Sequence, residues 1–334
     1  MPAFPQRYND DFRGWPVSPQ HQQHAVRGTF LDPRPDPTFG AIYHTGVDVA
    51  VRDDRPEQGA PPGRTHRVFA IEGGVVDAAS PPGTRGSVRI GHFGYGHVDA
   101  RVARGDRVRA GQFIGWTTKG SWHVHLTEFH FTADGRQVLL NPLRPGGKVR
   151  PYVDTAPPVI DDVRFYTPAT PPWGSRVTGV AQLPPAGKRL DKSRLAGVVD
   201  IRARIRDPQS FIGWFKQVPL LAAPHHPYRL GLLLVERPSE RVVLRRTVFI
   251  AAHQIPIATG QHYAPGTKQN HPAQPALDRK IHGAGEYWFR LFQKPYWNTA
   301  RLKNGRYLLV VRVWDAAGNR ARSDIEIGIR NPPL

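Results

Sequence analysis

The sequence predicts an all-β protein, and three observations lead to this class. Glycine and proline are frequent, with 33 Gly and 34 Pro among 334 residues, which is typical of a chain with many turns. The segments between them are short, and several carry apolar residues at alternate positions, the period of a strand that buries one face. No apolar run reaches the length of about 18 residues that a membrane-spanning helix needs, so no membrane span is expected.

The first half of the chain is expected to form one antiparallel β-sheet domain after an N-terminal arm. Residues 1–27 are polar and contain several prolines, which predicts an extended arm anchored by Trp15 and Val17. Strands and tight turns are then expected in residues 28–34, 38–51, 64–80, 87–93, 102–117 and 120–131. The segment NPLRP, residues 141–145, is expected to close this domain, so we divide the chain into 1–27, 28–150 and 151–334.

The second half is expected to form a basic β-sandwich. After a proline-rich linker, residues 197–207 alternate between an apolar face and a polar one. The apolar face carries Val199, Ile201, Ala203 and Ile205, and the polar face carries Asp200, Arg202, Arg204 and Arg206. Further strands are expected in residues 228–236, 241–250, 286–292, 305–319 and 323–330. Residues 305–319 resemble the last hairpin of immunoglobulin-like sandwiches, and residues 251–284 are expected to be a long insertion.

Charge is distributed unevenly between the two halves. Residues 1–150 hold 19 Lys and Arg against 14 Asp and Glu, whereas residues 151–334 hold 27 against 13. The second half is therefore the better candidate for contact with an anion, such as nucleic acid, lipid headgroups or an acidic wall polymer. An arginine-rich composition inherited from a GC-rich genome explains the same numbers, so the composition alone leaves both interpretations open.

Metal binding in this chain would depend on His, Asp and Glu, because there is no cysteine. The N-terminal segment also lacks the apolar core of a secretory signal. Two interpretations follow: export uses a segment upstream of this sequence, or the protein remains inside the cell.

His44 and Asp48 are the first pair with metal-ligand character. The alternation of valines around them favours strand over helix. In a straight strand, residues four apart are separated by about 13 Å, too far for both to bind one metal with bonds of about 2 Å. If both are ligands, the chain must bend between them, and we expect the bend at Gly46. The alternative for this pair is an ordinary turn capped by the aspartate.

His123 and His125 form the second such pair, in the segment GSWHVHLTEFHF. Two residues apart on a strand, they point to the same face at a spacing of about 6.6 Å. One can then bind a metal while its neighbour reaches a group held beside that metal. Taken alone, such a pair is more often a feature of a solvated strand face.

Together the motifs resemble those of the lysostaphin-like, or LytM-type, zinc metalloendopeptidases, which cut the peptide part of bacterial peptidoglycan. The matching pieces are HTGVD, THRVFAIEGGVV, YGHV, GDRVRAGQFIGW, HVH and NPL, in the order of the family and over about residues 15–147. The resemblance implies that His44, Asp48 and His125 bind Zn²⁺, and that His97 and His123 are catalytic histidines. Three protein ligands leave a position open, as in a catalytic zinc site.

The resemblance also gives the expected partners and location. We expect a peptidoglycan hydrolase of the cell envelope or the extracellular space that acts as a monomer, although the sequence does not determine the oligomeric state. Its basic C-terminal domain is expected either to contact anionic wall polymers or to serve only as a spacer that packs on the peptidase. One alternative is a catalytically inert envelope scaffold or hydrolase activator with the same fold, and another is a basic nucleic-acid-binding protein. Eight further histidines are expected at the surface or in loops, namely His66, His130, His225, His226, His253, His262, His271 and His282.

Overall fold

The all-β prediction is confirmed by the computed structural model, in which strands of antiparallel sheets make up nearly all regular structure. The structure describes residues 10–36, 40–168, 187–211, 223–255, 259–269, 285–293 and 296–333. Helical structure within these ranges is limited to α1 (Thr259–His262) and two short 3₁₀ turns, Lys192–Arg194 and Thr299–Arg301. None of the helices described is long and apolar enough to cross a membrane.

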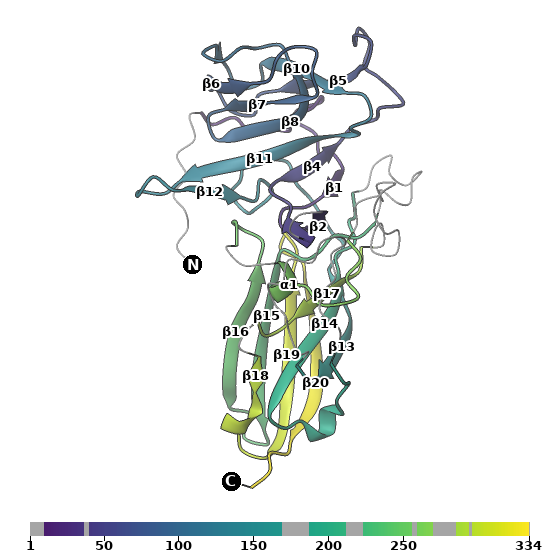
Figure 1. The fold of residues 1–334 in the computed structure, drawn as a ribbon, viewed down its shortest axis with the longest axis vertical. Coiled ribbons are helices and arrows are strands. Elements are labelled where there is room, and N and C mark those ends of the chain that lie inside the picture. Colours follow the sequence, from purple (N-terminus) through teal and green to yellow (C-terminus); the bar gives the residue numbers. More distant parts are fainter. Residues whose placement is uncertain are drawn as a thin grey trace.

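A ten-stranded antiparallel sheet fills the first half of the chain and lies at one end of the molecule (Figure 1). Its main strand order is β1-β4-β11-β8-β7-β6-β9, with β10 paired to β5 and β8, and β12 paired to β11. The strands are β1 (Val26–Gly28), β4 (Val47–Ala50), β5 (Arg64–Phe69), β6 (Gly74–Ala79), β7 (Gly86–Ile90), β8 (Phe93–Ala100), β9 (Arg107–Val108), β10 (Phe113–Thr118), β11 (His123–Phe131) and β12 (Gln137–Leu140). A separate hairpin pairs β2 (Pro33–Asp36) with β3 (Gly40–Tyr43).

The pairing of β11 with its two neighbours fixes the register of the candidate site residues. His125 of β11 lies opposite Asp48 of β4 on one side and Gly96 of β8 on the other. His97 follows Gly96 on β8 and has a positive φ of 63°, a conformation that non-glycine residues seldom adopt. Three strands that are distant in sequence therefore meet where four of the five predicted residues lie.

The N-terminal arm packs on this sheet, and Trp15 and Val17, the two expected anchors, are both buried. Trp15 is fully buried, and its indole Nε1 donates a hydrogen bond to the Pro151 carbonyl at 2.8 Å. Val17 forms a β-bridge with Val68, and residues 26–28 form β1, paired with β4. Residues 1–9 lie outside the described part of the chain. The arm packs because its few apolar residues complete the core.

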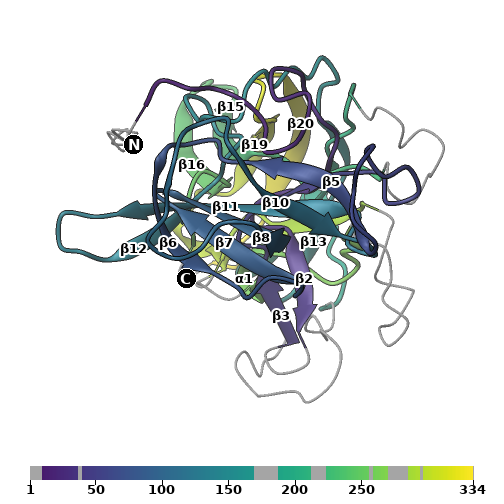
Figure 2. The same ribbon diagram turned by 90° about the horizontal axis from the view of Figure 1, so that it is seen from above.

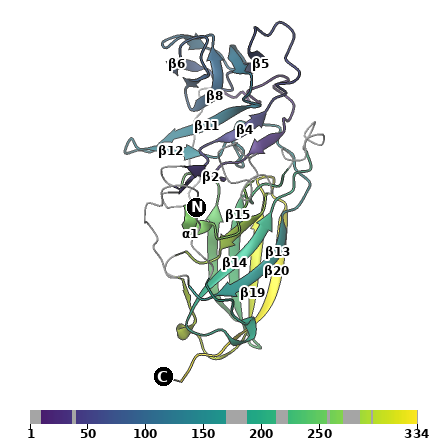
Figure 3. The same ribbon diagram turned by 45° about the vertical axis from the view of Figure 1, so that its right-hand side comes forward.

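Two four-stranded antiparallel sheets form a sandwich in the second half of the chain. One contains β13 (Val159–Tyr166), β14 (Val198–Arg206), β17 (Tyr287–Arg290) and β18 (Trp297–Asn298); the other has the order β16-β15-β19-β20. The second sheet comprises β15 (Arg229–Arg237), β16 (Val242–Ile250), β19 (Gly305–Trp314) and β20 (Arg320–Ile329). Its long strands run along the long axis of the molecule, whereas those of the N-terminal sheet run across it (Figures 1 and 3).

The basic outer face predicted for residues 197–207 is only partly present. The apolar residues face the core as predicted, but Asp200 and Arg202 are also buried. Their charges are paired: Arg202 Nη2 lies 2.7 Å from Asp200 Oδ2, and the buried Arg290 contacts the same oxygen. The Tyr166 ring covers the Arg202 guanidinium, 4.4 Å from ring centroid to Cζ. At this part of β14, Asp200, Arg202 and Arg290 form a buried ion triad where a solvated face was predicted, because the neighbouring strand β17 supplies Arg290.

The sandwich is joined to the N-terminal sheet by backbone and side-chain contacts, and the sheet lies above the sandwich in Figures 1 and 3 and overlaps it when seen from above in Figure 2. Leu140 of β12 forms a β-bridge with His253, and the Asn141 N–H donates to the Ala252 carbonyl at 2.9 Å. Contacts of this kind hold the sheet in one orientation on the sandwich.

Three of the histidines expected at the surface or in loops are buried in this junction. His225, His226 and His262 are 2%, 3% and 4% exposed, respectively. His226 Nε2 lies 3.0 Å from the Phe30 carbonyl, and the Tyr43 hydroxyl lies 2.6 Å from His262 Nδ1. They are buried because the proline- and glycine-rich loops that carry them pack against the N-terminal half. His271 and His282 lie outside the described residues.

Candidate metal centre

His44, Asp48 and His125 converge at one point, as the resemblance implies. His44 Nε2 lies 3.0 Å from His125 Nδ1, and Asp48 Oδ1 lies 3.1 Å and 3.0 Å from these two nitrogens. The chain bends between His44 and Asp48 as expected, since β3 ends at Tyr43 and β4 begins at Val47. These three residues form a His/Asp group of the kind that can hold a metal ion.

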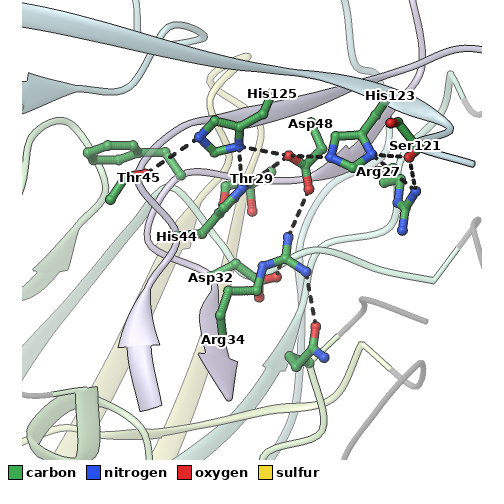
Figure 4. A network of polar contacts seen from close by, with 12 residues as sticks. Arg27, Thr29, Asp32, Arg34, His44, Thr45, Asp48, Ser121, His123 and His125 are labelled. Atoms are coloured by element: carbon green, nitrogen blue, oxygen red, sulfur yellow. Dashed lines mark hydrogen bonds and ion pairs between the residues drawn. The ribbon is translucent and has the colours of Figure 1, made fainter. Parts of the chain in front are cut away.

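The hydrogen bonds around these ligands orient them for a cation (Figure 4). His44 Nδ1 donates to the Thr29 carbonyl at 2.8 Å, so the neutral ring presents an unprotonated Nε2 to the centre. His125 Nε2 lies 3.1 Å from the Thr127 hydroxyl, which can accept a hydrogen bond from the Nε2–H group. In that tautomer Nδ1 of His125 is unprotonated. Two imidazole lone pairs and a carboxylate oxygen then face one another, an arrangement that a cation stabilises.

The spacing and chemistry of the group suit zinc. Ligands on a tetrahedral zinc with bonds of about 2.0–2.1 Å are separated by about 3.3–3.4 Å, close to the contacts of 3.0 and 3.1 Å among these three atoms. Nitrogen and oxygen donors in this number leave a fourth position for a water molecule or a substrate. His44 and Asp48 are buried, and the His125 side chain is 22% exposed, so the centre is reached from the His125 side.

His123 lies beside the group without completing it. The buried Arg27 Nη1 lies 3.2 Å from both His123 Nδ1 and the Ser121 carbonyl, but the Ser121 carbonyl is closer to Nδ1, at 2.5 Å, so Nδ1 donates to it. The neutral ring therefore leaves Nε2 unprotonated, and this atom lies 3.4 Å from Asp48 Oδ1. His123 thus presents a proton acceptor to the centre.

His97 has the opposite tautomer. The Arg85 Nε–H donates to His97 Nδ1 at 3.2 Å, so the neutral ring carries its proton on Nε2 and can donate a hydrogen bond there. The centroid of the His97 ring lies 4.5 Å from that of His123 and 6.5 Å from that of His125. The structure therefore brings all five predicted residues together.

Burial keeps His44, His97 and His123 neutral. Burial lowers the pKa of His44 to about 4, and that of His97 also to about 4, with nearby Arg34 and Arg85 respectively acting in the same direction. Burial also lowers the pKa of His123 well below its ordinary value. Burial alone would raise the pKa of Asp48, but the three histidines around it hold that pKa well below the usual range. Neutral imidazoles beside an ionised carboxylate are the forms that bind zinc.

Arg34 is a residue of the site that the sequence reasoning missed. Its Nη2 lies 3.2 Å from Asp48 Oδ2 and 3.3 Å from Asp32 Oδ2. Its Nη1 donates to Gln269 Oε1 at 3.4 Å, and the Tyr287 hydroxyl donates to Asp32 Oδ1 at 2.9 Å. Asp48 can therefore present Oδ1 to a metal because Arg34 holds Oδ2, and Arg34 itself is held by residues of the C-terminal half.

Two glycines make room for this arrangement. A Cβ on Gly28 would lie 2.1 Å from Arg34 Nη2 and 2.7 Å from Asp48 Oδ2. A Cβ on Gly46 would lie 2.3 Å from the Leu126 carbonyl oxygen. The clash at Gly46 is with backbone, so that position requires glycine, whereas a Cβ at Gly28 would force the Arg34 and Asp48 side chains to move. The glycine in HTGVD is thus explained by the close approach of β11, in addition to the bend.

We expect Arg34→Ala to weaken zinc binding by about 10- to 100-fold, the usual effect of removing a group that orients a metal ligand. Competition against a chromophoric zinc chelator measures this change. Arg64→Ala is a matched control, because Arg64 makes a similar ion pair with Asp99 elsewhere in the sheet, and its side chain is 16% exposed compared with 13% for Arg34. Equal affinity losses in the two variants would contradict a specific role for Arg34.

The fold and the site define an all-β protein with a candidate metal-binding group of two histidines and an aspartate. No protein-family model and no curated protein matches the chain. Among solved structures it is similar to dimeric latent PorU from Porphyromonas gingivalis, with 11% identity and a TM-score of 0.27. That alignment covers 80% of this chain and 20% of the PorU chain. A likeness this distant carries no argument about function.

Proposed function

We propose that this protein is a zinc-dependent endopeptidase that hydrolyses peptide bonds of bacterial peptidoglycan, in the stem peptide or the cross-bridge. The observation that supports the reaction is the convergence of Asp48 Oδ1 with the nitrogens of His44 and His125 within 3.1 Å, beside two further neutral histidines. The choice of peptidoglycan as the substrate rests on the resemblance to the LytM-type motifs.

The three converging residues would hold the metal. His44 Nε2, His125 Nδ1 and Asp48 Oδ1 are the atoms that face the centre. A zinc ion bound there supplies a Lewis acid that lowers the pKa of a water molecule and polarises a carbonyl group. The protein's own contribution is to hold these ligands through the Thr29 carbonyl, Thr127 and Arg34.

The tautomers of the two remaining histidines divide the proton chemistry. His123 accepts a proton at Nε2 from the attacking water, since its Nδ1 proton is held by Ser121. His97 donates its Nε2 proton as a hydrogen bond to the carbonyl oxygen as negative charge develops there. The proton taken up by His123 then passes to the amine as the C–N bond breaks. Water thus adds across the peptide bond, and both histidines return to their starting forms.

The two alternatives to a peptidase fit the site less well. Inert scaffolds and hydrolase activators typically lose a ligand or a catalytic histidine, whereas this chain has the three-residue His/Asp group, and the His97 ring lies beside that of His123. A nucleic-acid-binding protein has no need for a buried His/Asp group. The partial burial of the basic face predicted on β14 also removes one of the observations that favoured it.

One surface of the sandwich is a candidate for the expected contact with anionic wall polymers. A pocket of about 500 Å³ is lined by Arg312, Trp314, Arg320, Ala321 and Arg322. The Arg229 guanidinium lies over the Trp314 ring, with its Cζ 4.8 Å from the centroid. Arginines beside an aromatic ring can contact both the charge and the sugar faces of an acidic polysaccharide. Such contact would place the protein in the cell envelope or outside the cell.

The direct test is digestion of purified sacculi by zinc-loaded protein, followed by mass analysis of the released muropeptides. A peptidase is expected to release fragments with new amino and carboxyl ends and unchanged glycan linkages, and the fragment masses identify the bond. Protein with His44→Ala provides the matched control, because it lacks a ligand but keeps the sandwich. Unchanged sacculi with zinc-loaded protein would contradict the proposed function.

A further inference from the structure

A second group of potential metal ligands lies outside the histidine centre. Asp154, Asp207 and Asp315 each offer a carboxylate oxygen, and these oxygens lie within 4.8 Å of one another. All three residues are buried, with 7%, 6% and 2% of their surface exposed. Two oxygens bound to one Ca²⁺ at about 2.4 Å are at most about 4.8 Å apart. The three carboxylates are therefore close enough to share a single calcium ion.

The three carboxylates come from different segments at one end of the sandwich. Asp154 is in the linker that follows the N-terminal sheet, Asp207 follows β14, and Asp315 follows β19. These strand ends lie nearest the N-terminal sheet (Figure 1). The Asn319 amide donates to the Asp154 carbonyl at 2.7 Å and to Asp315 Oδ2 at 2.7 Å, which ties the linker to the turn.

Hydrogen bonds satisfy two of the carboxylates but not the third. Asp154 Oδ1 accepts from the N–H groups of Ala156 and Ser210, each at 2.9 Å. Asp315 Oδ1 accepts from the Gly318 and Asn319 N–H groups. Asp207 Oδ1, in contrast, is a buried oxygen without a hydrogen-bond partner. A buried carboxylate oxygen left unpartnered is costly unless a ligand is present.

Charge around the group is also uncompensated. Among the described residues, no Lys, Arg or His forms an ion pair with any of the three aspartates. Burial raises the pKa of Asp207 well above its ordinary value, and Asp315 and Asp154 raise it further. Asp207 also lines a small cavity of about 20 Å³ with Tyr152 and His225, which is enough volume for one water molecule or ion. Asp154 and Asp315 do not line this cavity, so the indication of a cation rests on the burial of the three carboxylates, their proximity and the missing partner of Asp207 Oδ1.

We infer that Asp154, Asp207 and Asp315 bind a calcium ion that fastens the linker to the sandwich. All donors are oxygens, which Ca²⁺ prefers and zinc does not. Carbonyl groups and water complete the six to eight ligands that calcium takes. The site is separate from the histidine centre in residues and in donor chemistry, so it stands whether or not the protein is a peptidase.

Calcium binding can be tested by thermal unfolding of the full chain, stripped of divalent ions and then given one equivalent of zinc. Excess CaCl₂ is expected to raise the Tm by about 5 °C or more, as for a ligand present at about 100 times its Kd. Asp207→Asn is expected to abolish this rise and to raise the Tm measured without calcium, because it removes one of three repelling charges. The control Asp48→Asn disrupts the histidine centre and should keep the calcium response.

Terbium luminescence of the wild-type protein tests the calcium site directly, so the test does not depend on a variant that folds. Tb³⁺ replaces Ca²⁺ in oxygen sites and emits when a nearby aromatic ring is excited, here Tyr152 or Trp314. Wild-type protein is expected to give terbium emission that CaCl₂ removes by competition, and Asp315→Asn is expected to give none. An unchanged Tm with calcium, an equal rise in Asp207→Asn, or terbium emission insensitive to CaCl₂ would each overturn the inference.

Discussion

Replacing His123 by alanine is expected to lower sacculus digestion by about 10²- to 10⁴-fold, the usual contribution of a general base, while the protein keeps its zinc. The reason is the division of roles on β11. His125 faces the centre with Nδ1 at 3.0 Å from Asp48 Oδ1, whereas His123 Nε2 is at 3.4 Å and outside the His/Asp group. Elemental analysis for zinc and muropeptide release are measured on the same preparation.

The matched control is His130→Ala, on the same strand but at its far end, opposite Val138 of β12. This variant should digest sacculi as the wild type does. Loss of zinc in His123→Ala would contradict the assignment, because it would make His123 a fourth ligand and leave no position open. Normal digestion by zinc-loaded His123→Ala would instead exclude it as the base.

The site residues were named from the resemblance to the LytM-type motifs, and two local features of the sequence are compatible with that assignment. Two histidines two apart on a strand must share a face, and a histidine and aspartate four apart can meet only across a bend. The structure has both features, in β11 and at residues 44–46. The class of fold was predicted from local features as well, since alternation of apolar residues and frequent turns act over a few residues each.

The residues that support the site could not be predicted because their partners are distant in sequence. Arg34 contacts Asp48, 14 residues away, and Gln269, 235 residues away. Nothing in the segment that carries Arg34 indicates either contact. The burial of His226 against the Phe30 carbonyl could not be predicted for the same reason. A proline-rich loop is expected at the surface unless a distant part of the chain covers it.

These distant contacts change how the C-terminal half should be regarded. In the loop between β1 and β2, the Thr29 carbonyl accepts a hydrogen bond from His44. The Leu31 carbonyl of the same loop accepts one from the Tyr263 hydroxyl of the C-terminal half, at 3.0 Å. Deleting residues 151–334 would therefore remove groups that hold the metal ligands. Loss of activity in such a truncation would not separate wall binding from support of the site, and point variants are the better test.

His125→Ala is expected to lose zinc and all sacculus digestion, in contrast to His123→Ala. With this ring removed, two ligands remain, and the wild-type stabilisation by zinc, about 4 kcal/mol at 1,000 times the Kd, should disappear. Thermal unfolding with and without zinc measures this term, and dialysis followed by elemental analysis measures the bound metal. A variant that still holds about one zinc per chain would show that the ligand set is wrong.

Thr127→Val provides the graded counterpart of that variant, because it keeps the His125 ring and removes only the hydroxyl 3.1 Å from its Nε2. Zinc affinity is expected to fall by about 10- to 100-fold, and digestion should recover when zinc is added in excess. Recovery separates loss of orientation from loss of a ligand, since added zinc cannot restore His125→Ala. If Thr127→Val bound zinc as tightly as the wild type, the hydroxyl would have no part in setting the tautomer of His125, and the strand itself would be sufficient to present Nδ1 to the metal.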